Sequence, residues 1–146
     1  ASDVYKRQLT GFGAFLANKE GLESGLMIVH YVAAALTSEL HLLSNSTTTY
    51  NVPVSLDKED HVSMGATGAY RALKSTKLLS QVLANELICA SEAIDRISES
   101  PGDGVKKIHS WVRNFVNPMN SDRSMTSDCE KISTLLIDGE HSSIFR

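Results

Sequence analysis

The sequence has few of the residues that mark disulfide-rich or membrane-spanning proteins. It contains only two cysteines, Cys89 and Cys129, and three prolines in 146 residues. Two cysteines are too few for a disulfide framework, so we expect reduced thiols in a cytoplasmic protein. The densest apolar stretch, residues 26–36, is interrupted by His30 and is far shorter than the roughly 20 residues that a membrane span needs. The sequence therefore predicts neither a small secreted domain nor a membrane protein.

A strong excess of either charge is also missing. Lys and Arg number 14 against 17 Asp and Glu, which leaves a net charge of -3. Such a balance provides no general attraction to phosphate backbones or anionic lipid, so we expect no nucleic-acid partner and no membrane partner. Apolar residues make up 42% of the chain and charged residues 21%. This composition is typical of a globular protein, and the length suffices for a core.

Residues 1–8 (ASDVYKRQ) share neither periodicity nor turn residues with the segment that follows. We interpret them as a non-native junction or processing scar and treat residues 9–146 as one helical region. Residues 9–23 carry three glycines among polar residues and predict an irregular loop.

Two long helices are predicted next. The first runs from Gly25 to Leu43 with Ser24 as its cap, and it is apolar on nearly every face, which predicts burial on most sides. Residues 44–60 lack periodicity and predict an irregular linker. The second helix begins between Ser63 and Gly65 and extends to Ile97, with apolar residues at steps of three and four. A helix of this length is nearly 50 Å long, at roughly 1.5 Å per residue, so we expect it to pack against helices from elsewhere.

Two shorter helices complete the predicted fold. Asp103 is expected to cap the third, which carries one apolar stripe as far as Phe115 and ends before Pro118. A capping box, Ser127-x-x-Glu130, announces the fourth, which Gly139 closes. No strand pattern and no internal repeat competes with this assignment. The predicted fold class is all-α, a bundle built on long helices.

Sequence motifs of common enzyme classes are absent. There is no phosphate-binding glycine loop, paired CxxC, HExxH or GxSxG motif, and the five histidines are too widely spaced to predict a metal site. Residues 58–65 (KEDHVSMG) nevertheless place a lysine, two carboxylates and a histidine directly before the second long helix. One interpretation is an acidic helix N-terminus that meets the helix dipole. The other is an acid/base or ammonium-binding site. The spacing alone does not choose between them.

Three blocks of sequence resemble one enzyme family. The block EDHVSMG, residues 59–65, looks like the sequence at this place in the histidine ammonia-lyase family, the aromatic amino acid lyases and aminomutases. FLANKEGLESGLMI, residues 15–28, resembles the family's FLTPEGGLNSGFMI, and VAAALTSEL, residues 32–40, resembles its AAALASEN helix. The resemblance covers residues 9–97 without a gap. Residues 105–145 match in pattern only, including the pair Asp122 and Arg123.

The resemblance implies the C-terminal portion of an elongated, all-helical homotetramer with active sites built from several subunits. It also implies a methylidene-imidazolone electrophile, which the family forms from an internal Ala-Ser-Gly in the N-terminal half. This sequence contains no Ala-Ser-Gly. The resemblance therefore implies that the chain alone lacks the electrophile.

Individual site residues also follow from the resemblance. Glu59 matches the active-site glutamate of histidine-specific members and is the predicted catalytic and substrate-binding residue, able to pair with a cation or move a proton. Met27 matches a position that holds methionine in histidine lyases and lysine in plant phenylalanine lyases, although a buried core methionine fits equally well. Lys58 and Asp57 depart from the family's Gln or Asn and Asn, and Lys58 is also predicted to line the substrate site.

These observations predict a carbon–nitrogen lyase that eliminates ammonia from histidine, or from a related aromatic amino acid, to give the acrylate. Two alternatives stay open. An aminomutase would share the electrophile and return the ammonia to the β-carbon. A non-catalytic assembly module would keep the helices without the chemistry, and the departures at Asp57 and Lys58 favour it. The resemblance assigns Asp60, His61 and Ser63 to shaping the loop and capping the long helix.

Overall fold

The structure is a computed structural model that describes residues 11–49 and 51–145. The junction assigned to residues 1–8 lies outside the described residues. Four α-helices account for most of the fold: α2 (Met27–Leu43), α3 (Gly65–Ile94), α4 (Asp103–Arg113) and α5 (Thr126–Ile137). Two 3₁₀ helices, η2 (Ala14–Leu16) and η3 (Glu140–Phe145), lie near the ends. Strand pairing in the described ranges is limited to one isolated bridge, so the predicted all-α class is confirmed.

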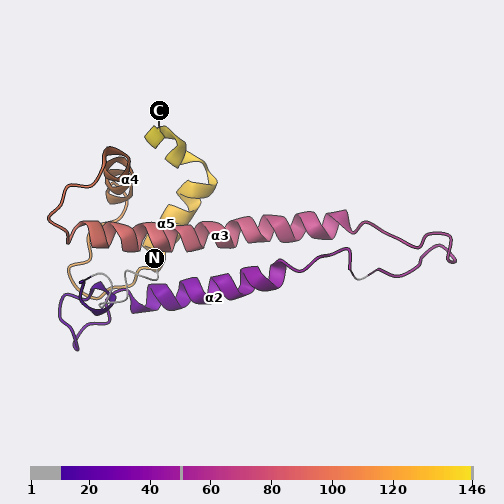
Figure 1. Cartoon of the computed structure of the whole chain (residues 1–146), viewed down its shortest axis with the longest axis horizontal. Helices are drawn as coiled ribbons and strands as arrows, with labels where there is room; N and C mark the ends of the chain where they lie inside the picture. The colour runs from indigo at the N-terminus through magenta and orange to yellow at the C-terminus, as the bar shows by residue number, and fades with distance from the viewer. Residues whose placement is uncertain (1–10, 50, 146) are drawn as a thin grey trace.

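The longest helix, α3, is the axis of the molecule (Figure 1). Helix α2 lies beside it, α4 and α5 pack on its C-terminal half, and the chain between α2 and α3 projects beyond the helices as a long loop. The core therefore gathers at one end of the molecule. Its largest fully buried apolar side chains come from η2, α3, α4, α5 and the residues that flank α2 and α4, and they are Leu16, Leu26, Ile88, Cys89, Val112, Val116 and Ile132.

The other half of the molecule has no core of its own. Half of the apolar side chains of α2 are exposed, with Tyr31 at 67%, and among its residues only Val29 is buried. The expectation that α2 is buried on most sides is therefore wrong for this chain, because α3 covers only one face of α2. The N-terminal half of α3 is similar, with Tyr70 exposed at 76%. The expectation that α3 packs against helices from elsewhere stays a prediction.

The helix boundaries agree with the pattern better than the caps do. Helix α3 begins at Gly65, within the predicted range from Ser63 to Gly65, but ends at Ile94 rather than Ile97. The reason is a tightened last turn, in which the amide of Arg96 donates to the carbonyl of Ala93 and its guanidinium occupies the carbonyl of Glu92. Helix α4 likewise ends at Arg113, two residues before the predicted Phe115. Gly139, with φ of +77°, follows α5 as expected.

Several predicted caps are wrong. The N-cap residues are Leu26, Met64, Gly102 and Met125, and none of them makes a side-chain capping bond. Residues proposed as caps therefore lie elsewhere: Ser24 and Ser63 precede the caps, while Asp103 and Ser127 lie inside the first turn. Ser24 does meet a partner, since its backbone amide donates to Asp122 Oδ2 over 2.7 Å. A distant carboxylate thus stabilises the approach to α2 in place of a local hydroxyl.

Candidate functional site

The loop that carries Lys58 and Glu59 has a defined backbone. Val54 and Glu59 exchange two backbone hydrogen bonds, of 2.8 and 3.2 Å, which form the isolated antiparallel bridge. Between them Ser55, Leu56 and Asp57 all have positive φ, from 57 to 60°. Three consecutive non-glycine residues in the left-handed region form an unusual tight turn. Lys58 and Glu59 follow this turn directly, so its geometry sets their direction.

Glu59 is exposed at this loop, and so are its neighbours Lys58, Asp60 and His61. Its carboxylate makes no hydrogen bond or ion pair with the described residues, and neither does the ammonium of Lys58. A carboxylate that has no partner among the described residues is available to a cation from outside them. This arrangement suits both interpretations of the segment, because a helix-end carboxylate would also be exposed.

Met27 lies at the other end of α2. It is the first residue of that helix, whereas Glu59 belongs to the segment between α2 and α3, which projects beyond the C-terminus of α2 (Figure 1). The 17 residues of α2 span about 25 Å at the helical rise of roughly 1.5 Å per residue. Met27 is half-buried and lines a cavity of about 290 Å³ with Phe15, Ala17 and Glu23. The structure therefore brings Lys58 and Glu59 together but does not bring Met27 to them within one chain.

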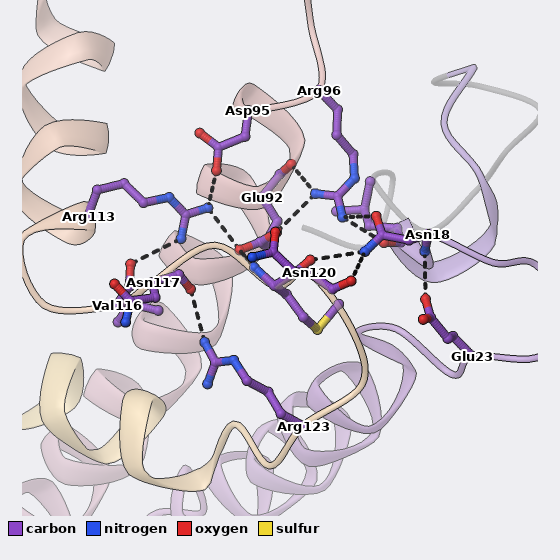
Figure 2. Close-up of polar contacts among 12 residues, drawn as sticks. Asn18, Glu23, Glu92, Asp95, Arg96, Arg113, Val116, Asn117, Asn120 and Arg123 are labelled. Atoms are coloured by element: carbon purple, nitrogen blue, oxygen red, sulfur yellow. Dashed lines mark hydrogen bonds and ion pairs between the residues drawn. The ribbon is translucent and has the colours of Figure 1, made fainter.

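The C-terminal end of α3 holds a buried ion network that the sequence pattern did not predict (Figure 2). Glu92 is 1% exposed and accepts hydrogen bonds from Arg96, from Arg113 and from the backbone amide of Met119, at 2.9, 2.9 and 3.0 Å. Arg113 also pairs with Asp95 at 2.5 Å. Each charged group in this network is paired with a group of opposite charge. The network therefore serves to hold segments of the chain together. The spacing of Glu92 and Arg96, four residues apart on one helix, was the available sequence signal.

The same network joins distant parts of the chain. Arg96 donates to the carbonyl of Leu16 at 2.9 Å and to the side chain of Asn18 at 3.3 Å. Asn18 in turn donates to the carbonyls of Met119 and Asn120 at 3.1 and 2.9 Å. Figure 2 shows these bonds converging from three segments. The irregular N-terminal segment is thereby fixed to the end of α3 and to the segment between α4 and α5.

Asp122 provides a second tie between distant segments. Its two oxygens accept the backbone amides of Ser24 and Gly25, at 2.7 and 2.9 Å. Gly25 has φ of +56°, and a Cβ there would lie 2.4 Å from the carbonyl oxygen of Phe15. Only glycine fits this crowded position. The block GLESGLMI therefore contains two kinds of residue. Packing requires glycine at position 25, whereas we assigned Met27, two residues later, to the substrate site.

A groove of about 610 Å³ lies between α2, α3 and the start of α5. Its lining is mainly apolar and includes Ile28, Val32 and Leu36, with Asn85 and Cys129 among its polar members. Burial, with the nearby Cys89 and Asp128, raises the pKa of the Cys129 thiol to about 11. The thiol is therefore protonated at neutral pH, which argues against a thiolate nucleophile in this groove.

The described part of the chain contains neither a candidate metal-binding group nor a candidate membrane span. No group of three or more His, Cys, Asp or Glu side chains there is arranged to hold a metal ion. The helices of residues 11–49 and 51–145 also include none that is long and apolar enough to cross a bilayer. His109, at 2.6 Å from Asp95, belongs to the ion network.

Comparison with known proteins gives one consistent result. The sequence profile of the family described as aromatic amino acid lyase matches residues 2–114. The histidine ammonia-lyase of Natranaerobius thermophilus is 40% identical over 130 residues, which cover 88% of this chain and 26% of that protein. The histidine ammonia-lyase of Symbiobacterium thermophilum is 37% identical over 134 residues, which cover 91% of this chain and 26% of that protein.

Solved structures of the same family match the fold. The histidine ammonia-lyase of Trypanosoma cruzi superposes with a TM-score of 0.90 at 31% identity, over 98% of this chain and 28% of that one. A tyrosine aminomutase of Streptomyces globisporus gives 0.91 at 30% identity, with the same coverage. The chain thus spans about a quarter of the length of the relatives that it matches. By the extent of the profile match, the chain belongs to the aromatic amino acid lyase family.

Proposed function

We propose that this chain forms part of an enzyme that eliminates ammonia from histidine, or from a related aromatic amino acid, to give the acrylate. In that reaction the bond between the α-carbon and nitrogen breaks and a β-proton is lost. The observation that carries the proposal is Glu59, an exposed carboxylate without a partner among the described residues, in a chain whose curated relatives are histidine ammonia-lyases. We also propose that the enzyme is cytoplasmic.

Glu59 is the residue to which we assign the chemistry. Its carboxylate is placed to pair with the cationic ammonium or imidazole of the substrate, or to take up a proton. Lys58 is adjacent and equally exposed, and it adds a positive charge that suits the substrate's carboxylate. Met27 is assigned to the apolar wall that receives the aromatic ring.

The electrophile is not among these residues. The family resemblance implies a methylidene-imidazolone, which supplies an electron-poor centre that activates the substrate toward loss of ammonia. The 146 residues contain no Ala-Ser-Gly from which to form it. We therefore assign to this chain only binding and proton transfer, and the isolated chain is expected to be inactive.

Assembly is the second part of the proposal. Met27 and Glu59 lie at opposite ends of α2, so one substrate meets both only where different copies of the chain come together. Exposed apolar side chains on the intervening helices, among them Tyr31, Tyr70 and Leu73, are suitable for such contacts. We assign the enzyme a homo-oligomeric state, a tetramer, with each site completed by more than one subunit.

The test uses an enzyme in which this chain replaces the matching quarter of the Natranaerobius thermophilus protein. Glu59→Gln is expected to lower kcat/KM for histidine by about 10²–10⁴-fold, the usual contribution of a positioned acid or base. Asp60→Asn, which removes the adjacent exposed carboxylate, is the matched control and should change it by less than about threefold. Acrylate absorbance gives the rate, and light scattering gives the number of subunits.

Each outcome is informative. Equal effects of the two substitutions on kcat/KM would indicate that Glu59 is only a helix-end carboxylate. Such a group contributes at most about 1 kcal/mol to stability. A loss for histidine with tyrosine unaffected would place the carboxylate against the imidazole. An enzyme that assembles but stays inactive before any substitution would favour the non-catalytic assembly module and overturn the proposal.

A second candidate function is that of an aminomutase. The observation in its favour is the superposition on the tyrosine aminomutase, which is as close as that on the lyase. Product analysis separates the two functions. A β-amino acid that accumulates from tyrosine in the assembled enzyme would support the aminomutase, and the acrylate with free ammonia would support the lyase.

A further inference from the structure

The loop that carries Glu59 has no hydrophobic core to fix its shape. Leu56, at its tip, is 95% exposed, and Val52 and Val54 are exposed as well. Burial of apolar surface therefore contributes little to holding this segment. Its conformation must depend on polar contacts across the loop.

Asn51 makes the outermost of these contacts. Its side-chain Nδ2 donates to the carbonyl of Val62 at 2.5 Å, and its Oδ1 accepts the backbone amide of Val62 at 2.9 Å. The carboxamide thus imitates a strand partner and bonds both polar groups of one residue. The two bonds join positions eleven residues apart, which enclose Lys58, Glu59, Asp60 and His61.

A second closure lies inside the first. The backbone bridge between Val54 and Glu59 closes the left-handed turn of Ser55, Leu56 and Asp57. Those three residues have a backbone conformation that L-amino acids without a constraint rarely adopt. Release of the outer closure would let the turn relax toward ordinary backbone angles. The direction of Glu59 would then change, because Glu59 is itself one of the bridging residues.

We infer that Asn51 is a positioning residue for Glu59, acting through the closure of the loop by its paired bonds to Val62. The inference rests on the proposed function, since it requires Glu59 to act on substrate. Asn51 itself has no assigned contact with substrate. A neighbouring asparagine, Asn45, provides a natural comparison, because its Nδ2 donates to the carbonyl of Leu42 at the end of α2 and does not cross the loop.

The experiment is a double-mutant cycle in the assembled enzyme described above. Asn51→Ala is expected to lower kcat/KM for histidine by about 10- to 100-fold, the cost of displacing a catalytic group by roughly an ångström. Asn45→Ala should change it by less than about threefold. In the Glu59→Gln background, Asn51→Ala should have little further effect, because a residue that acts through Glu59 loses its role when Glu59 has lost its charge. Melting temperature and oligomer size are measured for every variant.

The cycle separates the failure of this inference from that of the proposed function. A Glu59→Gln enzyme of full activity would remove the proposed function. A weak Glu59→Gln enzyme combined with a fully active Asn51→Ala enzyme would overturn the positioning role alone. So would two losses that multiply, since independent effects indicate general loosening of structure. If Asn51→Ala reduces assembly, Asn51→Asp takes its place in the cycle, because it keeps the acceptor for the Val62 amide and replaces the donor to the Val62 carbonyl with a charged oxygen.

Discussion

The two ends of α3 use charged side chains in opposite ways. At the C-terminal end, Glu92 is buried and meets two arginines and a backbone amide within the same chain. Beyond the N-terminal end, Glu59 is exposed and has no partner among the described residues. A carboxylate near basic residues is thus a poor guide to function by itself. What distinguishes the two is whether the chain already satisfies the charge.

Apolar side chains follow the same division. Those on the C-terminal half of α3, including Ala84 and Ile88, are buried by α4, α5 and the N-terminal segment. Those on the N-terminal half, including Tyr70 and Leu73, face outward. One end of α3 therefore has a complete core, and the other leaves apolar side chains exposed.

The largest expected effect is at the C-terminal end of α3. Glu92→Ala should lower the free energy of unfolding of the chain by about 3–5 kcal/mol, because it leaves Arg96 and Arg113 without their shared buried partner. Glu99→Ala, an exposed carboxylate just after the helix, should stay within about 0.5 kcal/mol. Urea unfolding followed by circular dichroism measures both. Equal midpoints for the two variants would show that the network is not a stabilising tie and would break the comparison.

A smaller effect is expected at Asp122, where the bonds are exposed. Asp122→Ala removes the acceptor of two backbone amides ahead of α2 and should cost about 1–2 kcal/mol, as for a lost helix cap. Asp122→Asn keeps one side-chain oxygen as an acceptor and should cost less. The same unfolding experiment ranks them. A loss for Asn as large as that for Ala would mean that the carboxylate's charge, which both variants lack, matters more than the acceptor that Asn keeps.

Much of the fold was predictable because it depends on local pattern. Periodicity located four helices, the start of α3 at Gly65 and the end of α2 at Leu43. The predicted cap of α2 failed because the group that stabilises the approach to this helix lies far away in sequence. Asp122, which holds the amides before α2, is 98 residues from Ser24, and no local signal specifies such a pairing.

The candidate site was also predictable only in part. Lys58 and Glu59 were found from a short block, since they are neighbours in the sequence. Asn51 was not found, because its bonds to Val62 cross an irregular loop in which periodicity carries no information. Arg113, in the ion network, meets Glu92 across 21 residues and a helix boundary. Long-range polar contacts need the tertiary arrangement before they can be recognised.

The smallest expected effect concerns an ion pair between the N-terminal half of α3 and α2. Lys74 on α3 lies 2.5 Å from Glu39 on α2, with the side chains 51% and 43% exposed. The distance is as short as any in the buried network, so distance does not distinguish the two pairs, whereas burial does. Because solvent and salt screen exposed charges, Lys74→Ala should cost about 0–1 kcal/mol, and less at high salt.

The double exchange of Lys74→Glu with Glu39→Lys sharpens this prediction, because it reverses the pair without removing it. Unfolding midpoints at low and high salt should be nearly the same for the exchanged and original chains. A cost above about 2 kcal/mol that salt does not reduce would mean that this pair is desolvated. In a self-associated chain, that result would place the interface with other copies over α2 and the start of α3. In a monomer it would instead show that the chain covers this half itself, and the contrast between the two ends of α3 would not hold.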